Sequence, residues 1–157
     1  MTTQPTLAVG QPAPDFTLTD THGTPVTLSA LRGQTVLLVF FPFAFSGICT
    51  GELCELRDNL ALFENAGVKL IAVSCDAGFA QKAWAEQENY TFDIVSDFWP
   101  HGEVSTKYGV FDAERGLATR GSFLIDSEGL LRWSVVNGPG EARDFAGYRD
   151  AVAQIIG

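Results

Sequence analysis

The chain has 157 residues, a length typical of one domain. Hydrophobic residues make up 46% of it, enough to form a substantial core, and charged residues make up only 18%, which argues against a disordered chain. Its 19 acidic and 10 basic residues give a net charge of -9. Nucleic acids and anionic membranes bind clustered Lys and Arg, so this charge balance argues against both as partners. No signal-peptide pattern opens the chain, and the longest apolar run, Val36 to Phe45, is too short to span a bilayer. We therefore expect a soluble, cytoplasmic protein.

The cysteines and histidines narrow the chemistry further. Three cysteines without a secretory signal argue against a structural disulfide framework. Cys49 and Cys54 lie five residues apart, a spacing that matches neither a C-x-x-C redox motif nor common zinc sites. The two histidines, His22 and His101, are isolated in sequence from these cysteines and from each other. We therefore expect no metal site, and we expect a thiol to carry any chemistry.

Apolar patterning predicts alternating strands and helices along the chain. The predicted elements, in chain order, are two short strands within Phe16–Leu28, a buried strand at Thr35–Phe41, a helix at Gly51–Asn65 closed by Gly67, a strand at Val68–Ser74, a helix at Phe79–Glu88, a strand at Thr91–Val95, a short helix at Glu103–Tyr108, strands at Gly121–Ile125 and Leu130–Val136, and a helix at Phe145–Ile156.

This order of elements predicts the fold class. Strand–helix–strand crossovers imply parallel neighbours, whereas the turn at Asp126–Gly129 implies an antiparallel hairpin. We therefore expect an α/β protein with a mixed central sheet flanked by helices, in a thioredoxin-like arrangement with an N-terminal β extension. Residues 1–157 are expected to form a single domain. Acidic residues such as Asp97 are predicted to lie on the solvated surface.

The junction between the buried strand and the first long helix carries the clearest chemical signal. Cys49 lies near the first turn of that helix, where unpaired backbone N–H groups and the helix dipole favour a thiolate. Ser46 precedes it by three residues, the spacing of an N-cap hydroxyl, and Pro42 ends the strand. The simpler alternative is that Cys49 is a small buried hydrophobic residue.

The segment PFAFSGIC, Pro42–Cys49, resembles the active-site pattern P-x-x-x-T/S-x-x-C of peroxiredoxins. The resemblance extends to Val9–Phe16 at the start of the chain and to the late strand Gly121–Asp126. Ser96–Gly102 looks like the AhpE-type branch (alkyl hydroperoxide reductase E) of that family. The resemblance therefore covers nearly the whole chain.

This resemblance implies a thiol-dependent peroxidase that reduces hydrogen peroxide or organic hydroperoxides without a metal, haem or flavin. Cys49 matches the peroxidatic cysteine, whose thiolate attacks the peroxide and becomes a sulfenic acid. Pro42 and Ser46 match the other two motif positions. Arg120 matches a distant arginine that stabilises the thiolate and orients the peroxide. Glu52 also fits a family position and is expected to help hold that arginine.

Cys54 has two alternative roles. Its spacing from Cys49 resembles the intramolecular pair of the PrxQ (bacterioferritin comigratory protein) branch, which implies a resolving cysteine. Five residues along a helix place the two Cα atoms roughly 8 to 9 Å apart, beyond the ~7 Å limit for a disulfide. A Cys49–Cys54 bond therefore requires the first turns to unwind, which Gly47 and Gly51 would ease. The alternative is a buried helix cysteine, and Cys75, at the end of a buried strand, is predicted to be a packed thiol.

Other functions remain open at this stage. An external thiol, such as thioredoxin, glutaredoxin or a low-molecular-weight thiol, is expected to recycle the enzyme. A peroxide sensor or thiol–disulfide exchange protein would use the same thiol without peroxidase turnover. A non-catalytic binding module of the same fold would leave Cys49 no more reactive than a free thiol. The resemblance also suggests a homodimer.

Overall fold

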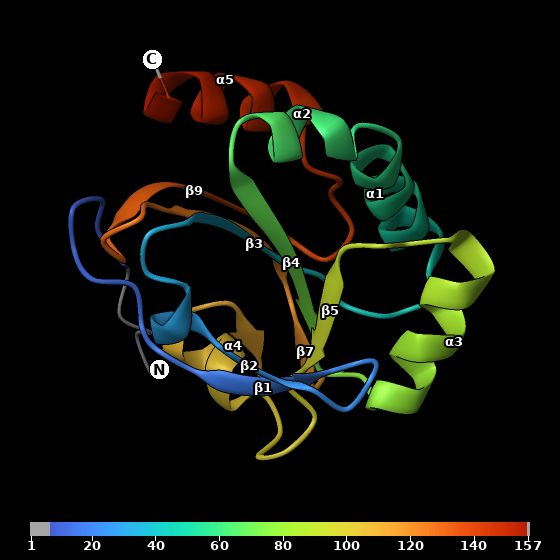
Figure 1. The fold of residues 1–157 in the computed structure, drawn as a ribbon. Helices are drawn as coiled ribbons and strands as arrows, with labels where there is room; N and C mark the ends of the chain where they lie inside the picture. Colours follow the sequence, from blue (N-terminus) through green and yellow to red (C-terminus); the bar gives the residue numbers. More distant parts are fainter. Residues whose placement is uncertain (1–6, 157) are drawn as a thin grey trace.

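The computed structural model describes residues 7–156, and seven strands form one mixed sheet in the order β2-β1-β5-β4-β3-β8-β9 (Figure 1). The strands of this sheet are β1 (Thr17–Asp20), β2 (Pro25–Thr27), β3 (Thr35–Phe40), β4 (Val68–Ser74), β5 (Asp93–Ser96), β8 (Arg120–Ile125) and β9 (Leu131–Asn137). The helices are η1 (Leu28–Leu31), a short 3-10 turn, α1 (Gly47–Asp58), α2 (Leu60–Asn65), α3 (Gly78–Glu88), α4 (Glu103–Lys107) and α5 (Phe145–Ile156). No helix of the described residues is long and apolar enough to cross a bilayer.

The direction of each strand follows from the connection that precedes it. β3, β4 and β5 are parallel, because the helices α1–α2 and α3 cross between them. β8 runs antiparallel to β3, and β9 turns back on β8 through the predicted tight turn. The β1–β2 hairpin adds to the free edge of β5. The expected thioredoxin-like α/β fold with an N-terminal β extension is confirmed.

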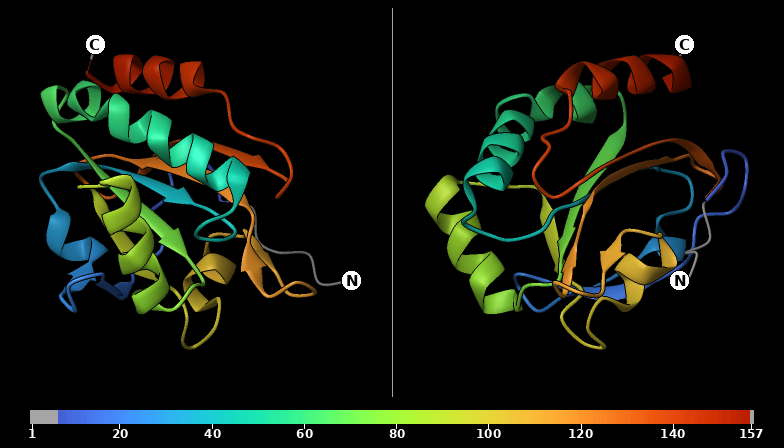
Figure 2. Two further views of the ribbon diagram at one scale, coloured as in Figure 1. Left: turned by 90° about the vertical axis from the view of Figure 1, so that its right-hand side faces the viewer. Right: turned by 180° about the vertical axis from the view of Figure 1, so that it is seen from behind.

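Two apolar cores lie on opposite faces of the sheet. The alternation of side chains along β3 sends Leu37 and Val39 into one core and Leu38 and Phe40 into the other. α1, α2, α3 and α5 cover the first face, and α4 and η1 cover the second (Figures 1 and 2). Because β3 is covered on both faces, the loop that follows it is anchored to a rigid central strand.

The predicted boundaries of the first long helix were wrong. The helix begins at Gly47, because Ser46 in an extended conformation caps it, and it ends at Asp58. Asn59, with φ −116° and ψ 18°, interrupts the helical path before α2 begins. Cys49 therefore lies within the first turn of α1, and Gly67 closes α2 with a φ of +73° as expected.

Two further features differ from the sequence-based expectations. A small antiparallel pair, β6 (Phe111–Asp112) and β7 (Leu117–Ala118), was not predicted. Asp97 does not lie on the solvated surface but is fully buried. Its carboxylate accepts hydrogen bonds from the backbone N–H of Val104 (3.1 Å) and Ser105 (2.8 Å), so it satisfies the otherwise unpaired start of α4.

Candidate active site

Cys49 is held in place by the loop that connects β3 to α1. Pro42, which is buried, follows β3 and directs the chain away from the sheet. Ser46 then caps α1, and its Oγ accepts a hydrogen bond from the backbone N–H of Cys49 at 3.3 Å. Cys49 is the third residue of the helix and is fully buried. Its sulfur therefore lies at the positive end of the helix dipole, where a thiolate is stabilised.

Arg120 reaches the sulfur of Cys49 from the neighbouring strand. It begins β8, which pairs with β3, and its side chain is only 2% exposed. Its Nη1 donates to Cys49 Sγ at 3.2 Å, and its Nε donates to the carbonyl of Pro139 at 2.8 Å. The fold thus brings together two residues that are 71 positions apart in the sequence.

Glu52 joins Arg120 to a second buried arginine, Arg143. One carboxylate oxygen of Glu52 accepts from Arg120 Nη1 (2.6 Å) and Arg143 Nη2 (2.8 Å). The other accepts from the backbone N–H (2.7 Å) and Nε (3.0 Å) of Arg143. Burial disfavours the charged carboxylate, yet the hydrogen bonds and charge of Arg143, aided by Arg120, lower the pKa of Glu52 below its ordinary value.

Arg143 was missed by the sequence analysis, and it also ties the two central strands together. Its Nη1 donates to the carbonyls of Phe40 (2.7 Å) and Gly121 (3.0 Å) and to Ser122 Oγ (3.0 Å). These partners lie at the end of β3 and near the start of β8. No motif links Arg143 to Glu52 across 91 residues, so only the folded structure reveals the pair.

The structure does not bring Cys54 to Cys49. Both lie on the continuous helix α1, and all three cysteines of the chain are unpaired. Cys54 Sγ lies 3.5 Å from Glu88 Oε2 and 3.5 Å from the hydroxyl of Tyr90. The sulfur of Cys54 therefore lies in a polar contact with α3 and the residues that follow it. A disulfide with Cys49 is incompatible with an intact α1.

Cys75 and His101 lie outside the site. Cys75 is buried, and burial raises the pKa of its thiol to about 11, as expected for an unreactive packed cysteine. The ring nitrogens of His101 lie 3.0 Å from the carbonyl of Phe98 and 2.7 Å from that of Gly116, so this imidazole is engaged away from Cys49. Among residues 7–156, no three His, Cys, Asp or Glu side chains are grouped to hold a metal ion.

Comparisons with known proteins identify the family. Residues 9–134 match the model of the AhpC/TSA family. Alkyl hydroperoxide reductase E of Mycobacterium tuberculosis is 49% identical over 150 residues, which are 95% of this chain and 98% of that protein. A putative peroxiredoxin of Synechocystis is 36% identical over 83% of this chain and 70% of its own. The crystal structure of reduced 2-Cys peroxiredoxin from Plasmodium vivax superposes with a TM-score of 0.87 at 26% identity, covering 96% of this chain and 82% of that one.

These matches and the fold define a thiol-dependent peroxidase. The chain belongs to the AhpC/TSA family, and within that family it is an AhpE-type peroxiredoxin.

The shared carboxylate of Glu52 predicts a pH-dependent loss of stability. At neutral pH we expect Glu52→Gln to lower the free energy of unfolding by about 3–5 kcal/mol, because it leaves buried guanidinium groups without their counter-charge. The folded pKa of Glu52 is below the ordinary value of 4.5. Its stabilising contribution is therefore complete above pH 4.5 and is lost as the pH falls through the folded pKa. Urea denaturation of the wild type and of Glu52→Gln at a series of pH values measures the difference in their free energies of unfolding.

Glu55→Gln is the matched control, since Glu55 is exposed on the same helix. It should change the free energy of unfolding by less than about 0.5 kcal/mol. A Glu52→Gln effect that stays constant down to the lowest pH, or an equal effect of Glu55→Gln, would contradict the assigned network.

Proposed function

We propose that Cys49 is the peroxidatic cysteine of this peroxidase and that Arg120 activates it. The contact of 3.2 Å between Arg120 Nη1 and Cys49 Sγ, at the first turn of α1, supports this assignment. The thiolate sulfur attacks the terminal oxygen of a hydroperoxide, forming an S–O bond as the O–O bond breaks. The sulfur is oxidised by two electrons to sulfenic acid, and the departing oxygen takes a proton to leave as water or an alcohol. The guanidinium stabilises negative charge on that oxygen.

Ser46 and Pro42 support this chemistry in different ways. The Oγ of Ser46 holds the backbone of Cys49, and we propose that its hydroxyl also donates to the bound peroxide. Pro42 is buried at the start of the loop, where it limits the backbone freedom of the segment that leads to Ser46. Substrates of this site are hydrogen peroxide and organic hydroperoxides, because the attack needs only a terminal peroxide oxygen.

Replacement of Arg120 tests the proposed function directly. We expect Arg120→Met to slow the oxidation of Cys49 by hydrogen peroxide about 10²- to 10³-fold in single-turnover stopped-flow measurements, since the charge that stabilises the transition state is removed. Arg120→Lys should recover only part of the rate, because an ammonium group lacks the planar fork of the guanidinium. Cys49→Ser should abolish turnover.

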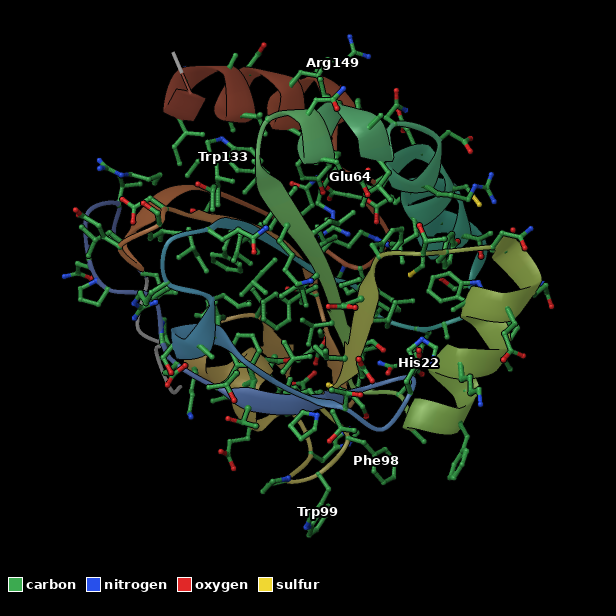
Figure 3. All side chains as sticks on the ribbon, viewed as in Figure 1. His22, Glu64, Phe98, Trp99, Trp133 and Arg149 are labelled. Carbon is green, nitrogen blue, oxygen red and sulfur yellow. The ribbon has the colours of Figure 1, made fainter. Side chains whose placement is uncertain are left out.

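Arg149→Met provides the control for loss of an arginine. Arg149 is exposed on α5 and lies over the ring of Phe145, at the top of the molecule in Figure 3. This variant should oxidise at the wild-type rate. An Arg120→Met rate within about threefold of the wild-type rate would refute the role of Arg120, since a stabilising contact in the transition state contributes more than that.

For the second half of the cycle, we propose that Cys54 resolves the sulfenic acid. The Cys54 thiol would attack the sulfur of Cys49, forming a disulfide and releasing the sulfenic oxygen as water. Glycine lowers helix stability, and Gly47 and Gly51 lie on either side of Cys49 in α1. These glycines favour local unwinding that would bring the two sulfurs together. An external thiol, such as thioredoxin, glutaredoxin or a low-molecular-weight thiol, would then reduce the disulfide.

Peptide mapping by mass spectrometry tests this role of Cys54. After one equivalent of peroxide, with remaining thiols blocked, we expect a disulfide between Cys49 and Cys54. Cys54→Ser should instead accumulate oxygen on Cys49, whereas Cys75→Ser should behave as the wild type because Cys75 is packed in the second core. Oxygen on Cys49 of the wild type with Cys54 still open to alkylation would mean a one-cysteine enzyme, whose sulfenic acid is reduced directly by the external thiol.

Exposed apolar side chains bear on how the chain associates. Phe45 and Ile48, close to Cys49 in the sequence, are half-exposed, and Phe98 and Trp99 extend outward from the loop after β5 (Figure 3). We propose that a second copy of the chain covers some of these exposed apolar side chains in a homodimer. A cytoplasmic location stays a prediction from the sequence.

The alternative function, a peroxide sensor or thiol–disulfide exchange protein, predicts oxidation of Cys49 by peroxide without sustained turnover.

A further inference from the structure

The loop that presents Cys49 is tied to the sheet through Asp76. Asp76 follows β4, the strand next to β3, and its Oδ2 accepts a hydrogen bond from the backbone N–H of Ala44 at 2.8 Å. Ala44 lies midway between Pro42 and Ser46. Among the hydrogen bonds of residues 7–156, this is the one that joins the backbone of residues 42–46 to an element outside the loop and α1.

Asp76 is itself fixed by a chain of hydrogen bonds that leads from the half-buried carboxylate to fully buried side chains. Ser74 Oγ donates to the same carboxylate oxygen at 2.7 Å, and Gln81 Nε2 donates to Ser74 Oγ at 2.8 Å. Ser74 and Gln81 are both fully buried, and Gln81 also donates to the carbonyl of Val95 at 3.0 Å. Gln81 belongs to α3, which packs beside β5 (Figure 1). The position of Asp76 is therefore set by α3 and two strands, independently of the loop.

The loop needs such a support because its backbone is strained. Phe45 has a φ of +70°, in the left-handed region that residues with a Cβ rarely adopt. Its ring packs against Trp84 of α3, with 6.3 Å between ring centroids. The next residue, Ser46, must keep its capping position for Cys49 to remain in the first turn of α1. A relaxed Phe45 would therefore displace both Ser46 and Cys49.

Displacement of Cys49 would disturb the reaction because Arg120 is also held outside α1. Its Nε donates to the carbonyl of Pro139, whereas its Nη1 donates to Glu52, three residues after Cys49 in α1. A shift of about 1 Å in the relative position of reacting groups can lower a rate about 100-fold. The contact between Arg120 and Cys49 thus depends on two supports, the network of Arg120, Glu52 and Arg143 and the hydrogen bond between Asp76 and the loop before α1.

We propose that Asp76 is a positioning residue for the peroxidase reaction, acting through its hydrogen bond to Ala44. This inference rests on the proposed role of Cys49 as the peroxidatic cysteine. Asp76 holds the loop in its strained form and thereby keeps the first turn of α1 against Arg120. What matters is an acceptor oxygen at this position, so an amide in place of the carboxylate serves equally well.

Two substitutions of Asp76 test the proposal. In Asp76→Ala the acceptor is lost, and we expect both the single-turnover oxidation of Cys49 by hydrogen peroxide and its alkylation by iodoacetamide near neutral pH to slow about 10- to 100-fold. In Asp76→Asn the amide oxygen still accepts from Ala44, and both rates should stay within about threefold of the wild type. Peptide mapping separates Cys49 from Cys54 and Cys75 in the alkylation assay.

Asp126→Ala is the matched control. Asp126 also follows a strand of the sheet, and its carboxylate accepts from the backbone N–H groups of Glu128 and Leu130, both at 2.9 Å. Asp126 lies beside the start of β3, because the end of β8 pairs with the start of β3. Cys49 follows the other end of β3, so the two residues lie at opposite ends of the strands. Asp126→Ala should destabilise the protein to heat but leave both rates of Cys49 unchanged.

The outcomes separate the two proposals. Wild-type rates in Asp76→Ala would overturn the role of Asp76, and equal slowing in Asp76→Asn would show that its charge acts, which also overturns the proposal. If Asp76→Ala does not fold, Ser74→Ala removes the support of Asp76, and unchanged rates in that variant would overturn the proposal. If peroxide fails to oxidise Cys49 in the wild type, the proposed function fails, whereas the alkylation rates still test Asp76.

Discussion

One buried carboxylate shared by two guanidinium groups organises this active site. Glu52 of α1 accepts hydrogen bonds from Arg120 of β8 and from Arg143 in the segment before α5. A buried charge is tolerated only when it is paired and hydrogen-bonded, so none of these three side chains is free to move alone. The network therefore fixes α1 relative to the sheet, and with α1 it fixes Cys49. The short contact between Arg120 and the sulfur is a consequence of that rigidity.

The same rigidity opposes the second step that we propose. Glu52 lies between Cys49 and Cys54 in the sequence, so unwinding α1 to join the two sulfurs would pull its carboxylate away from both arginines. In the proposed mechanism, oxidation of Cys49 would weaken one part of this arrangement, because a neutral sulfenic acid would interact less strongly with the Arg120 guanidinium than a thiolate would. The first turns of α1 would thus be more stable in the reduced enzyme than in the oxidised one. The extent to which α1 unwinds after oxidation decides between an internal Cys49–Cys54 disulfide and direct reduction of the sulfenic acid by an external thiol.

The sequence predicted those features that depend on local patterns. Continuous apolar runs located β3 and β4, and the Ser46–Cys49 spacing indicated an N-cap at Ser46, although the apolar period placed the start of the helix at Gly51 instead of Gly47. The break at Asn59 was missed because no Gly or Pro marks it. Arg120 was found only through the family resemblance, since 71 residues separate it from Cys49.

Arg143 and Asp76 could not be found from sequence at all. Arg143 bonds to backbone carbonyls of β3 and β8, and Asp76 bonds to a backbone N–H of the loop. Backbone groups are present at every position, so no residue pattern indicates such a partner. Asp97 was misjudged for a related reason, because the α4 amides that it caps become its neighbours only after folding.

A kinetic double-mutant cycle of Arg120→Met and Glu52→Gln tests the central claim most directly. The quantity to measure is the single-turnover rate of Cys49 oxidation by hydrogen peroxide at 25 °C, with the fold of each variant checked by circular dichroism. If Glu52 acts on Cys49 by orienting Arg120, the double variant should be no slower than Arg120→Met alone, within about threefold, because residues that act as one unit are not additive. A double variant slowed by the product of the two single effects would mean that Glu52 and Arg120 act independently, which would contradict the network described above.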